Sequence, residues 1–153
     1  MAILFDRDFG RVWTDGATPY VFCSVIRIPE KEHLHELAQK QLTLIRDVRR
    51  KFGLSYSILD LHLCPQVPTE LADEYFKDII PRQFKAGLKL KAIVKPEDKE
   101  LQKQLEWAVH QLPQLPISLH NTFEEALTYI NQMHHQKTND KPRKSILSFL
   151  VGG

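Results

Sequence analysis

Three side chains that could take part in catalysis occupy alternate positions near the middle of the chain: Asp60, His62 and Cys64. A thiol, an imidazole and a carboxylate within reach of one another could activate a nucleophile. On an extended strand these side chains share one side, but residues two apart are separated by roughly 6.5 to 7 Å, too far for direct hydrogen bonds without favourable rotamers. We therefore predict a polar strand end, where Asp60 caps backbone donors and Cys64 acts as a small hydrophobic residue.

The remaining candidate metal ligands lack the spacing that a site requires. Among the seven histidines, His33 and His35 are two apart on a predicted helix and point different ways, as do the neighbours His134 and His135. Neither pair has the i, i+4 spacing of a helical metal site. Cys23 and Cys64 have no C-x-x-C or Cys/His spacing, so they are interpreted as reduced thiols. We expect no metal and no cofactor.

Length and charge limit the class of protein. A chain of 153 residues is predicted to fold as one domain with a sizeable core, and its net charge of +2 gives no electrostatic case for nucleic acid as a partner. The local run Arg46, Arg49, Arg50 and Lys51 could bind an acidic partner or complement the negative end of a helix. No apolar run approaches the roughly 18 residues of a membrane span, and the first residues do not form a signal peptide, so we expect a cytoplasmic protein.

Short apolar runs alternate with amphipathic helical patterns along most of the chain. Such alternation predicts βαβ units, and hence an α/β fold with a mixed, largely parallel sheet. Turn signals near the N-terminus predict an antiparallel start. The first long helix has a buried stripe that Gln41 interrupts. The expected strands are residues 2–6, 11–15, 20–28 and the runs SYSILDLHL, LKLKAIV and PISLHN; the expected helices are residues 29–53, 69–87 and the segments DKELQKQLEWAVHQL and TFEEALTYINQM.

Several residues mark where the later helices begin or bend. Thr69 is predicted to cap the second helix through its hydroxyl. Pro81 lies inside that helix and predicts a kink or break between Ile80 and Arg82, because proline removes a donor and clashes with the preceding turn. Thr122 and Glu125 stand in capping-box register at the start of the last helix.

The pieces ILDL, DIIPRQFKAGLKLKAIVKP and TFEEALTYI, in this order, resemble the SpoIIAA-like branch of the STAS superfamily, the anti-sigma-factor-antagonist fold. The resemblance extends to about His134 and implies a mixed sheet with its four helices packed mainly on one face, and a binding role. In regulatory members, the loop after the ILDL-type strand carries a phosphorylatable serine in an Asp-Ser-Ser-Gly-like motif. Here that loop reads HLCPQVPTE, and only Thr69 offers a hydroxyl. We expect Thr69 to be structural.

The C-terminal segment differs in composition from the predicted domain, which spans residues 1–136. Residues 137–144, KTNDKPRK, are polar and contain a proline, so they predict a linker. The apolar segment that follows is too short to cross a membrane and is predicted to dock, most favourably on a second copy of the chain. Its apolar residues are Ile146, Leu147, Phe149, Leu150 and Val151.

These observations favour a non-enzymatic binding or regulatory module that acts through protein–protein contacts. The expected contact site is the strand end with Asp60, His62, Cys64 and Thr69. The alternative is a small-molecule or lipid-binding domain, or a minor enzyme, that uses the same end of the sheet. A cavity of several hundred cubic ångströms with a few convergent polar groups would favour this alternative, whereas a filled sheet end with an exposed patch would favour protein binding.

Overall fold

The computed structural model describes the backbone of residues 2–150 and the side chains of residues 5–136. Strands and helices alternate after an initial run of three strands, which confirms the predicted α/β fold. The elements are β1 (Ala2–Arg7), β2 (Gly10–Thr14), β3 (Tyr20–Val25), α1 (Lys31–Phe52), β4 (Ser55–Asp60), α2 (Thr69–Glu74), the π-helical turn η1 (Tyr75–Ile79), α3 (Ile80–Lys85), β5 (Leu88–Val94), α4 (Lys99–His110), β6 (Ile117–His120) and α5 (Phe123–Leu150).

The six strands form one sheet whose spatial order follows the order of the chain, from β1 to β6. β1 and β2 pair antiparallel, as do β2 and β3. The pairs β3–β4, β4–β5 and β5–β6 are parallel, and each is connected through a helical crossover. The mixed sheet with an antiparallel start is therefore as predicted.

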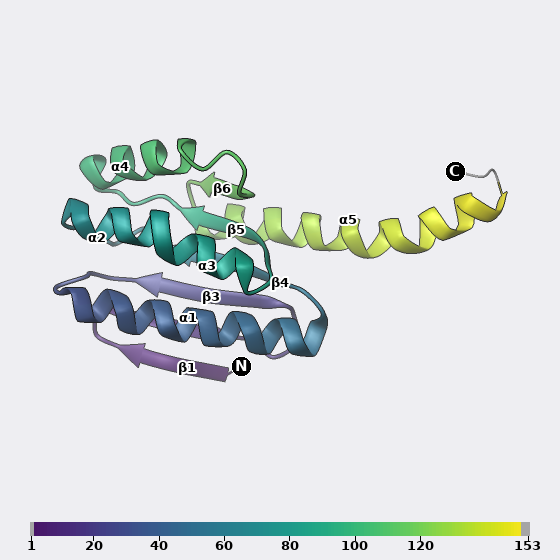
Figure 1. Ribbon diagram of the computed structural model, residues 1–153, viewed down its shortest axis with the longest axis horizontal. Coiled ribbons are helices and arrows are strands. Elements are labelled where there is room, and N and C mark those ends of the chain that lie inside the picture. The colour runs from purple at the N-terminus through teal and green to yellow at the C-terminus, as the bar shows by residue number, and fades with distance from the viewer. Residues whose placement is uncertain (1, 151–153) are drawn as a thin grey trace.

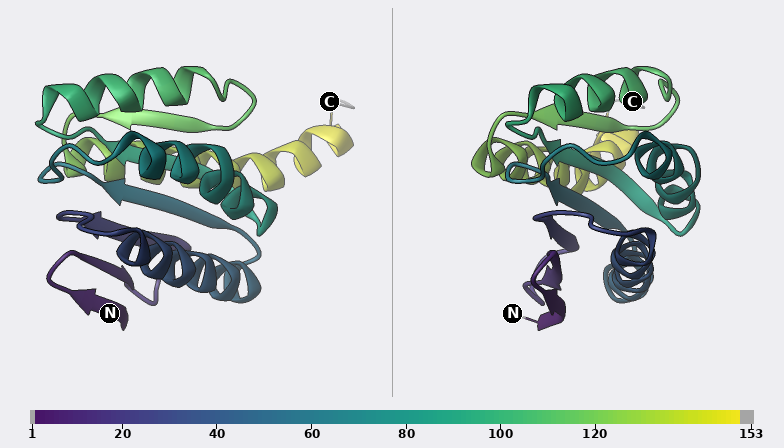
Figure 2. Two further views of the ribbon diagram at one scale, coloured as in Figure 1. Left: turned by 60° about the vertical axis from the view of Figure 1, so that its left-hand side comes forward. Right: turned by 90° about the vertical axis from the view of Figure 1, so that its left-hand side faces the viewer.

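Helices cover both faces of the sheet, as Figures 1 and 2 show. α1, α4 and the continuous segment α2–η1–α3 lie on one face, and α5 lies on the other. Two apolar clusters result. The larger lies under α1, η1, α3 and α4, and the smaller joins Ala126 and Ile130 of α5 to the aromatic side chains of β3 and β4.

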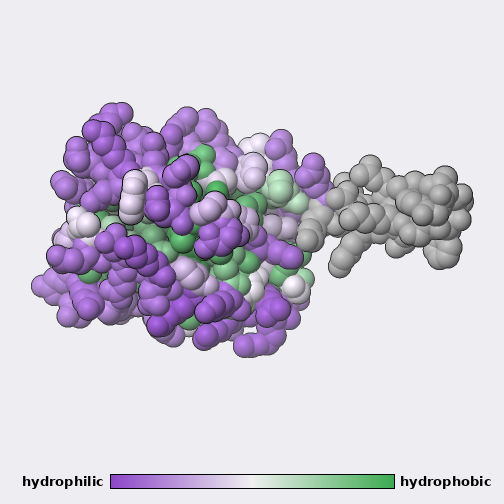
Figure 3. Space-filling view, turned by 45° about the horizontal axis from the view of Figure 1, so that its top comes forward, coloured by the Kyte–Doolittle hydropathy of each residue, from purple (hydrophilic) through white to green (hydrophobic). Residues whose placement is uncertain are grey.

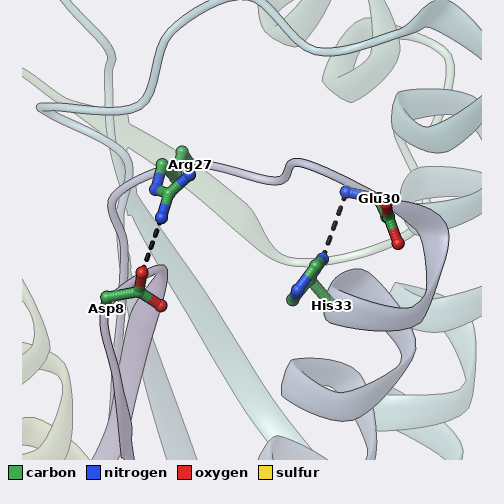
Figure 4. A network of polar contacts seen from close by, with 4 residues as sticks. All are labelled: Asp8, Arg27, Glu30 and His33. Atoms are coloured by element: carbon green, nitrogen blue, oxygen red, sulfur yellow. Dashed lines mark hydrogen bonds and ion pairs between the residues drawn. The ribbon is translucent and has the colours of Figure 1, made fainter.

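Helix α1 begins at Lys31, two residues after Pro29, because Glu30 and His33 form a cap at its start. The backbone N–H of Glu30 donates to Nδ1 of His33 at 3.2 Å, as Figure 4 shows. In the loop just before, Arg27 donates to the carboxylate of Asp8 at 2.6 Å and ties this loop to the β1–β2 turn. His33 therefore has a structural role at a helix end.

The segment around Pro81 is irregular, but the irregularity lies upstream of the break predicted between Ile80 and Arg82. Residues Tyr75–Ile79 form a π-helical turn, in which the N–H of Ile80 donates to the carbonyl of Tyr75, five residues back. A π-helical turn widens the helix just before the proline, which relieves the clash with the preceding turn and lets the chain continue into α3. The chain therefore has no break at Pro81, and the irregularity expected as a kink or break takes the form of a local widening before the proline.

Helix α5 begins with the predicted capping residues. The N–H of Glu125 donates to the hydroxyl of Thr122 at 3.1 Å, and the Glu125 carboxylate accepts from the N–H of Asn121. The helix continues to Leu150, so the backbone of residues 137–144, predicted as a linker, is helical. The side chains of Ile146, Leu147, Phe149 and Leu150 and all of Val151 lie outside the described residues, and their docking on a second copy stays a prediction. Within the described part of the chain, no helix combines the length and apolar character needed to span a membrane.

Candidate functional site

The chain turns sharply at the carboxyl end of β4, so the predicted alternation of Asp60, His62 and Cys64 does not extend past the strand. The carboxylate of Asp60 accepts a hydrogen bond from the backbone N–H of His62 at 2.9 Å. The N–H of Cys64 donates to the carbonyl of Leu61 at 2.9 Å, which closes a turn. Asp60 therefore caps backbone donors as predicted, but the three side chains do not share one face, because the strand ends at Asp60.

The side chains of His62 and Cys64 have different environments. His62 is exposed, and its Nε2 lies 3.1 Å from a carboxylate oxygen of Glu97. Cys64 is buried, and this burial raises the pKa of its thiol to about 11. A thiol with this pKa is protonated near neutral pH and is a poor nucleophile. The geometry gives no support to a nucleophile activated by these residues.

Thr69 does not cap the second helix. The residue at the N-cap position is Pro68, and Thr69 is the first helical residue, so its hydroxyl is past the position from which it could accept from the first turn. The hydroxyl instead accepts a hydrogen bond of 3.4 Å from the Nε2 of Gln104 in α4. The predicted cap at Thr69 is therefore wrong, and this residue links α2 to α4.

An apolar pocket lies between α1 and the α2–η1 segment, next to the carboxyl end of β4. Its volume is about 60 Å³, far below the several hundred cubic ångströms of typical small-molecule sites. The only polar side chains in its wall are Gln41, Cys64 and Tyr75; its apolar lining includes Val25, Leu37, Leu59, Leu61, Val67, Leu71 and Phe76. The predicted residue Cys64 thus faces this pocket, whereas His62 and Thr69 do not line it.

A buried polar network lies behind the pocket, and sequence reasoning missed it. Lys91 of β5 has no exposed surface, and its ammonium group donates to Ser57 Oγ at 3.1 Å and to Gln83 Oε1 at 2.9 Å. Gln83 and the hydroxyl of Tyr75 both donate to Gln41 Oε1, at 3.1 and 3.2 Å. Two sequence features could have predicted this network: Gln41 interrupts the apolar stripe of α1, and a lysine lies in a central strand.

The titration of the network follows from its burial. Desolvation lowers the pKa of Lys91 to about 8 and raises the pKa of Tyr75 above its usual value. It also raises the pKa of Cys23, a buried thiol outside the hydrogen-bonded network, to about 12. No carboxylate pairs with Lys91 among the described side chains. Lys91 also does not line the pocket, so the network shows no route for a substrate to reach its amine. Its contacts support a structural role.

A second depression, here called the α2–α4 groove, opens on the outside of the helical layer. It measures about 490 Å³ and is lined by Thr69, Ala72, Asp73, Phe76, Lys103, Gln104, Trp107 and Ala108. Trp107 is 58% exposed, which makes it one of the most exposed large hydrophobic side chains of the described residues. Figure 3 shows hydrophobic residues in furrows of an otherwise largely hydrophilic surface. Of the predicted site residues, Thr69 lies in this groove.

Several of the described histidines have polar partners of their own, and they do not converge on a metal. His35 lies 2.6 Å from the carboxylate of Glu74, and His120 lies 2.8 Å from the hydroxyl of Ser118. Within residues 5–136, no three or more His, Cys, Asp or Glu side chains form a group that could hold a metal ion.

Comparisons of the chain with models of known protein families, with curated proteins and with solved structures found no match.

Proposed function

We propose that this protein is a binding module without enzymatic activity, and that it recognises another protein through the α2–α4 groove. The observation that carries the proposal is the exposed Trp107 at the side of a largely apolar groove. The resemblance to STAS domains, in which a mixed sheet and its helices form a regulatory binding surface, supports the same class of function.

The composition of the groove suits an apolar anchor from a partner protein. Phe76 and Trp107 provide aromatic surface, and Ala72 and Ala108 leave room between the two helices. Tryptophan is enriched among the residues that contribute most to protein interfaces, because its large ring buries much apolar area at low entropic cost. A partner that inserts an apolar side chain here would cover the indole of Trp107.

Charged side chains at the sides of the groove can orient the partner. Asp73 lies 3.9 Å from Lys77 of its own helical segment, and Lys103 lies 3.9 Å from Glu100. These exposed pairs are weak and can be exchanged for contacts with a partner at little cost. The groove therefore suits a short segment with an apolar anchor between polar residues of both charges.

The test is affinity capture from the native cell extract with the wild-type chain, Trp107→Ser and Met133→Ser. Met133 is a matched control, since it is an exposed hydrophobic residue on α5, which packs on the other face of the sheet. We expect a protein that the wild type and Met133→Ser retain and Trp107→Ser loses, identified by mass spectrometry. If no retained protein depends on Trp107, the proposal is wrong.

The alternative function uses the apolar pocket that Cys64 lines, because this pocket could hold a small apolar group. Its volume of about 60 Å³ has room for only a few water-sized groups, so we expect no lipid to bind there. A ligand that binds only the folded state raises the midpoint of thermal unfolding. A rise of several degrees with benzene, a small apolar probe, would therefore favour the small-molecule alternative over protein binding.

The predictions of a cytoplasmic location and of a homodimer belong to the same proposal. A C-terminal contact with a second copy would present two α2–α4 grooves on one assembly and would strengthen binding to a partner with two anchors.

A further inference from the structure

A basic depression lies at the end of the sheet opposite to the carboxyl ends of β3 and β4. α1 connects these two parallel strands, so its last turn returns to the amino end of β4, beside the end of α3 (Figures 1 and 2). The depression measures about 450 Å³ and is lined by Arg46, Arg49, Arg50, Gly53 and Ala86. We call it the arginine depression.

Two of its three arginines have no acidic partner among the side chains of residues 5–136. Arg50 lies 3.4 Å from the carboxylate of Asp47, and both side chains are largely exposed. Among the described side chains, neither Arg46 nor Arg49 forms an ion pair or a hydrogen bond through its guanidinium. An exposed pair such as Arg50–Asp47 contributes little, so all three guanidinium groups can bind an incoming anion.

The backbone around the depression holds Arg49 in place and keeps the neighbouring surface open. A Cβ added at Gly87 would lie 2.0 Å from Cδ of Arg49, so the stem of this arginine rests directly on the glycine. Gly53 has a φ of +84°, and a Cβ there would meet nothing within 4 Å. The arginine is thus partly ordered before a ligand arrives, which reduces the entropy lost on binding.

The hydrogen-bond donors of the arginine depression favour carboxylates over phosphate. The N–H groups of Gly53, Ala86 and Gly87 already donate to helix carbonyls, so the depression offers guanidinium groups without a backbone nest. It also lies at helix C-termini, whose partial negative charge opposes a dense anion such as phosphate. Separate carboxylates, each paired with one planar guanidinium, meet these conditions better.

We propose that the arginine depression binds an extended acidic segment of a partner protein, with Arg46, Arg49 and Arg50 each pairing with one carboxylate. This site is independent of the α2–α4 groove, because it lies at the other end of the sheet. An acidic segment can therefore bind here whether or not Trp107 contacts a partner.

The test uses fluorescence anisotropy with a fluorescein-labelled octaglutamate peptide and the full chain at low salt. The double variant Arg46→Gln/Arg49→Gln removes two charges from the depression, and Lys31→Gln/Lys99→Gln removes two exposed charges at the starts of α1 and α4. We expect the first variant to bind at least tenfold more weakly than the wild type, and the control less than twofold more weakly. Thermal melts verify that both variants are folded.

Three results would overturn the proposal. The first is the absence of octaglutamate binding to the wild type. The second is equal weakening in both double variants, which would indicate a non-specific charge effect. The third is stronger binding of inorganic phosphate, of anionic phospholipid vesicles or of a single-stranded oligonucleotide than of octaglutamate, since each would assign another class of ligand to the depression.

Discussion

The two faces of the sheet are buried by different means. Under α1, η1 and α3, a hydrogen-bonded network crosses the core, and four of its side chains, Lys91, Gln83, Gln41 and Ser57, are no more than 1% exposed. Under α5 the core combines aliphatic and aromatic side chains, with Tyr20 and Tyr56 in edge contact at 5.9 Å. The first face depends on defined donor and acceptor positions, whereas the second depends on filled volume.

The largest effect is expected on the aromatic face. Ile130 of α5 is fully buried in that cluster, so Ile130→Ala should lower the free energy of unfolding by about 2 to 5 kcal/mol through lost burial and a cavity. Urea denaturation measures this change. Gln132→Ala, an exposed position on the same helix, should change it by less than about 0.5 kcal/mol. Equal effects would show that α5 is not packed as described.

A smaller loss is expected when the polar face loses its shared acceptor. Gln41→Leu removes the oxygen that accepts from Tyr75 and Gln83, and it leaves two buried donors unsatisfied. The free energy of unfolding, measured by urea denaturation, should fall by about 1 to 3 kcal/mol. Leucine suits an apolar core, but it gives the two donors no acceptor. Gln39→Leu on the exposed side of α1 is the matched control. A neutral Gln41→Leu would mean that this face tolerates substitutions as an ordinary apolar core does.

The charge of Lys91 should make stability depend on pH. Burial lowers the pKa of Lys91 from its usual 10.5 to about 8 in the folded chain. Between these values only the unfolded chain keeps the proton, so the stability that this group contributes rises with pH above about 8. Relative to Lys91→Met, the wild type should therefore gain about 1 kcal/mol of stability between pH 7 and pH 9.

Comparing the two proteins isolates the effect of this lysine. Burial raises the pKa of Cys23 and Cys64, so their contribution to stability falls as pH rises, but it does so in the wild type and in the variant alike. Chemical denaturation at both pH values provides the measurement. A difference between wild type and variant that does not change with pH would contradict a buried, shifted Lys91.

The smallest effect concerns the two helix starts beside the α2–α4 groove. Asp98 accepts the N–H of Leu101 at 2.9 Å and is the N-cap of α4, so Asp98→Ala should cost about 1 kcal/mol. Thr69→Ala should cost less than about 0.5 kcal/mol, because Pro68 occupies the N-cap of α2. Thermal melts of the two variants make the comparison, and a larger loss for Thr69→Ala would restore Thr69 as a cap.

The spacing of apolar residues predicted the fold well, because in most strands and helices here the apolar residues recur with the period of that element and face the core. It could not predict contacts that depend on how two elements meet. The predicted alternation of Asp60, His62 and Cys64 continued past the end of the strand. The Asp60 carboxylate accepts the N–H of His62 and so favours a turn over further strand, which the alternation of residue types does not reveal. The α2–α4 groove depends on how two helices separated by β5 pack together, and no pattern within either helix encodes that distance.

The strand order of the sheet has a consequence for synthesis on the ribosome. Each strand pairs with the one made just before it, so the sheet can grow by addition at one edge as the chain emerges. The helical face closes along with it, because α1 and α2–η1–α3 are made between the strands that they cover. The aromatic face stays uncovered until α5 is complete as far as Ile130. The nascent chain therefore exposes this apolar surface longest, and we expect a chaperone that binds nascent chains to bind there.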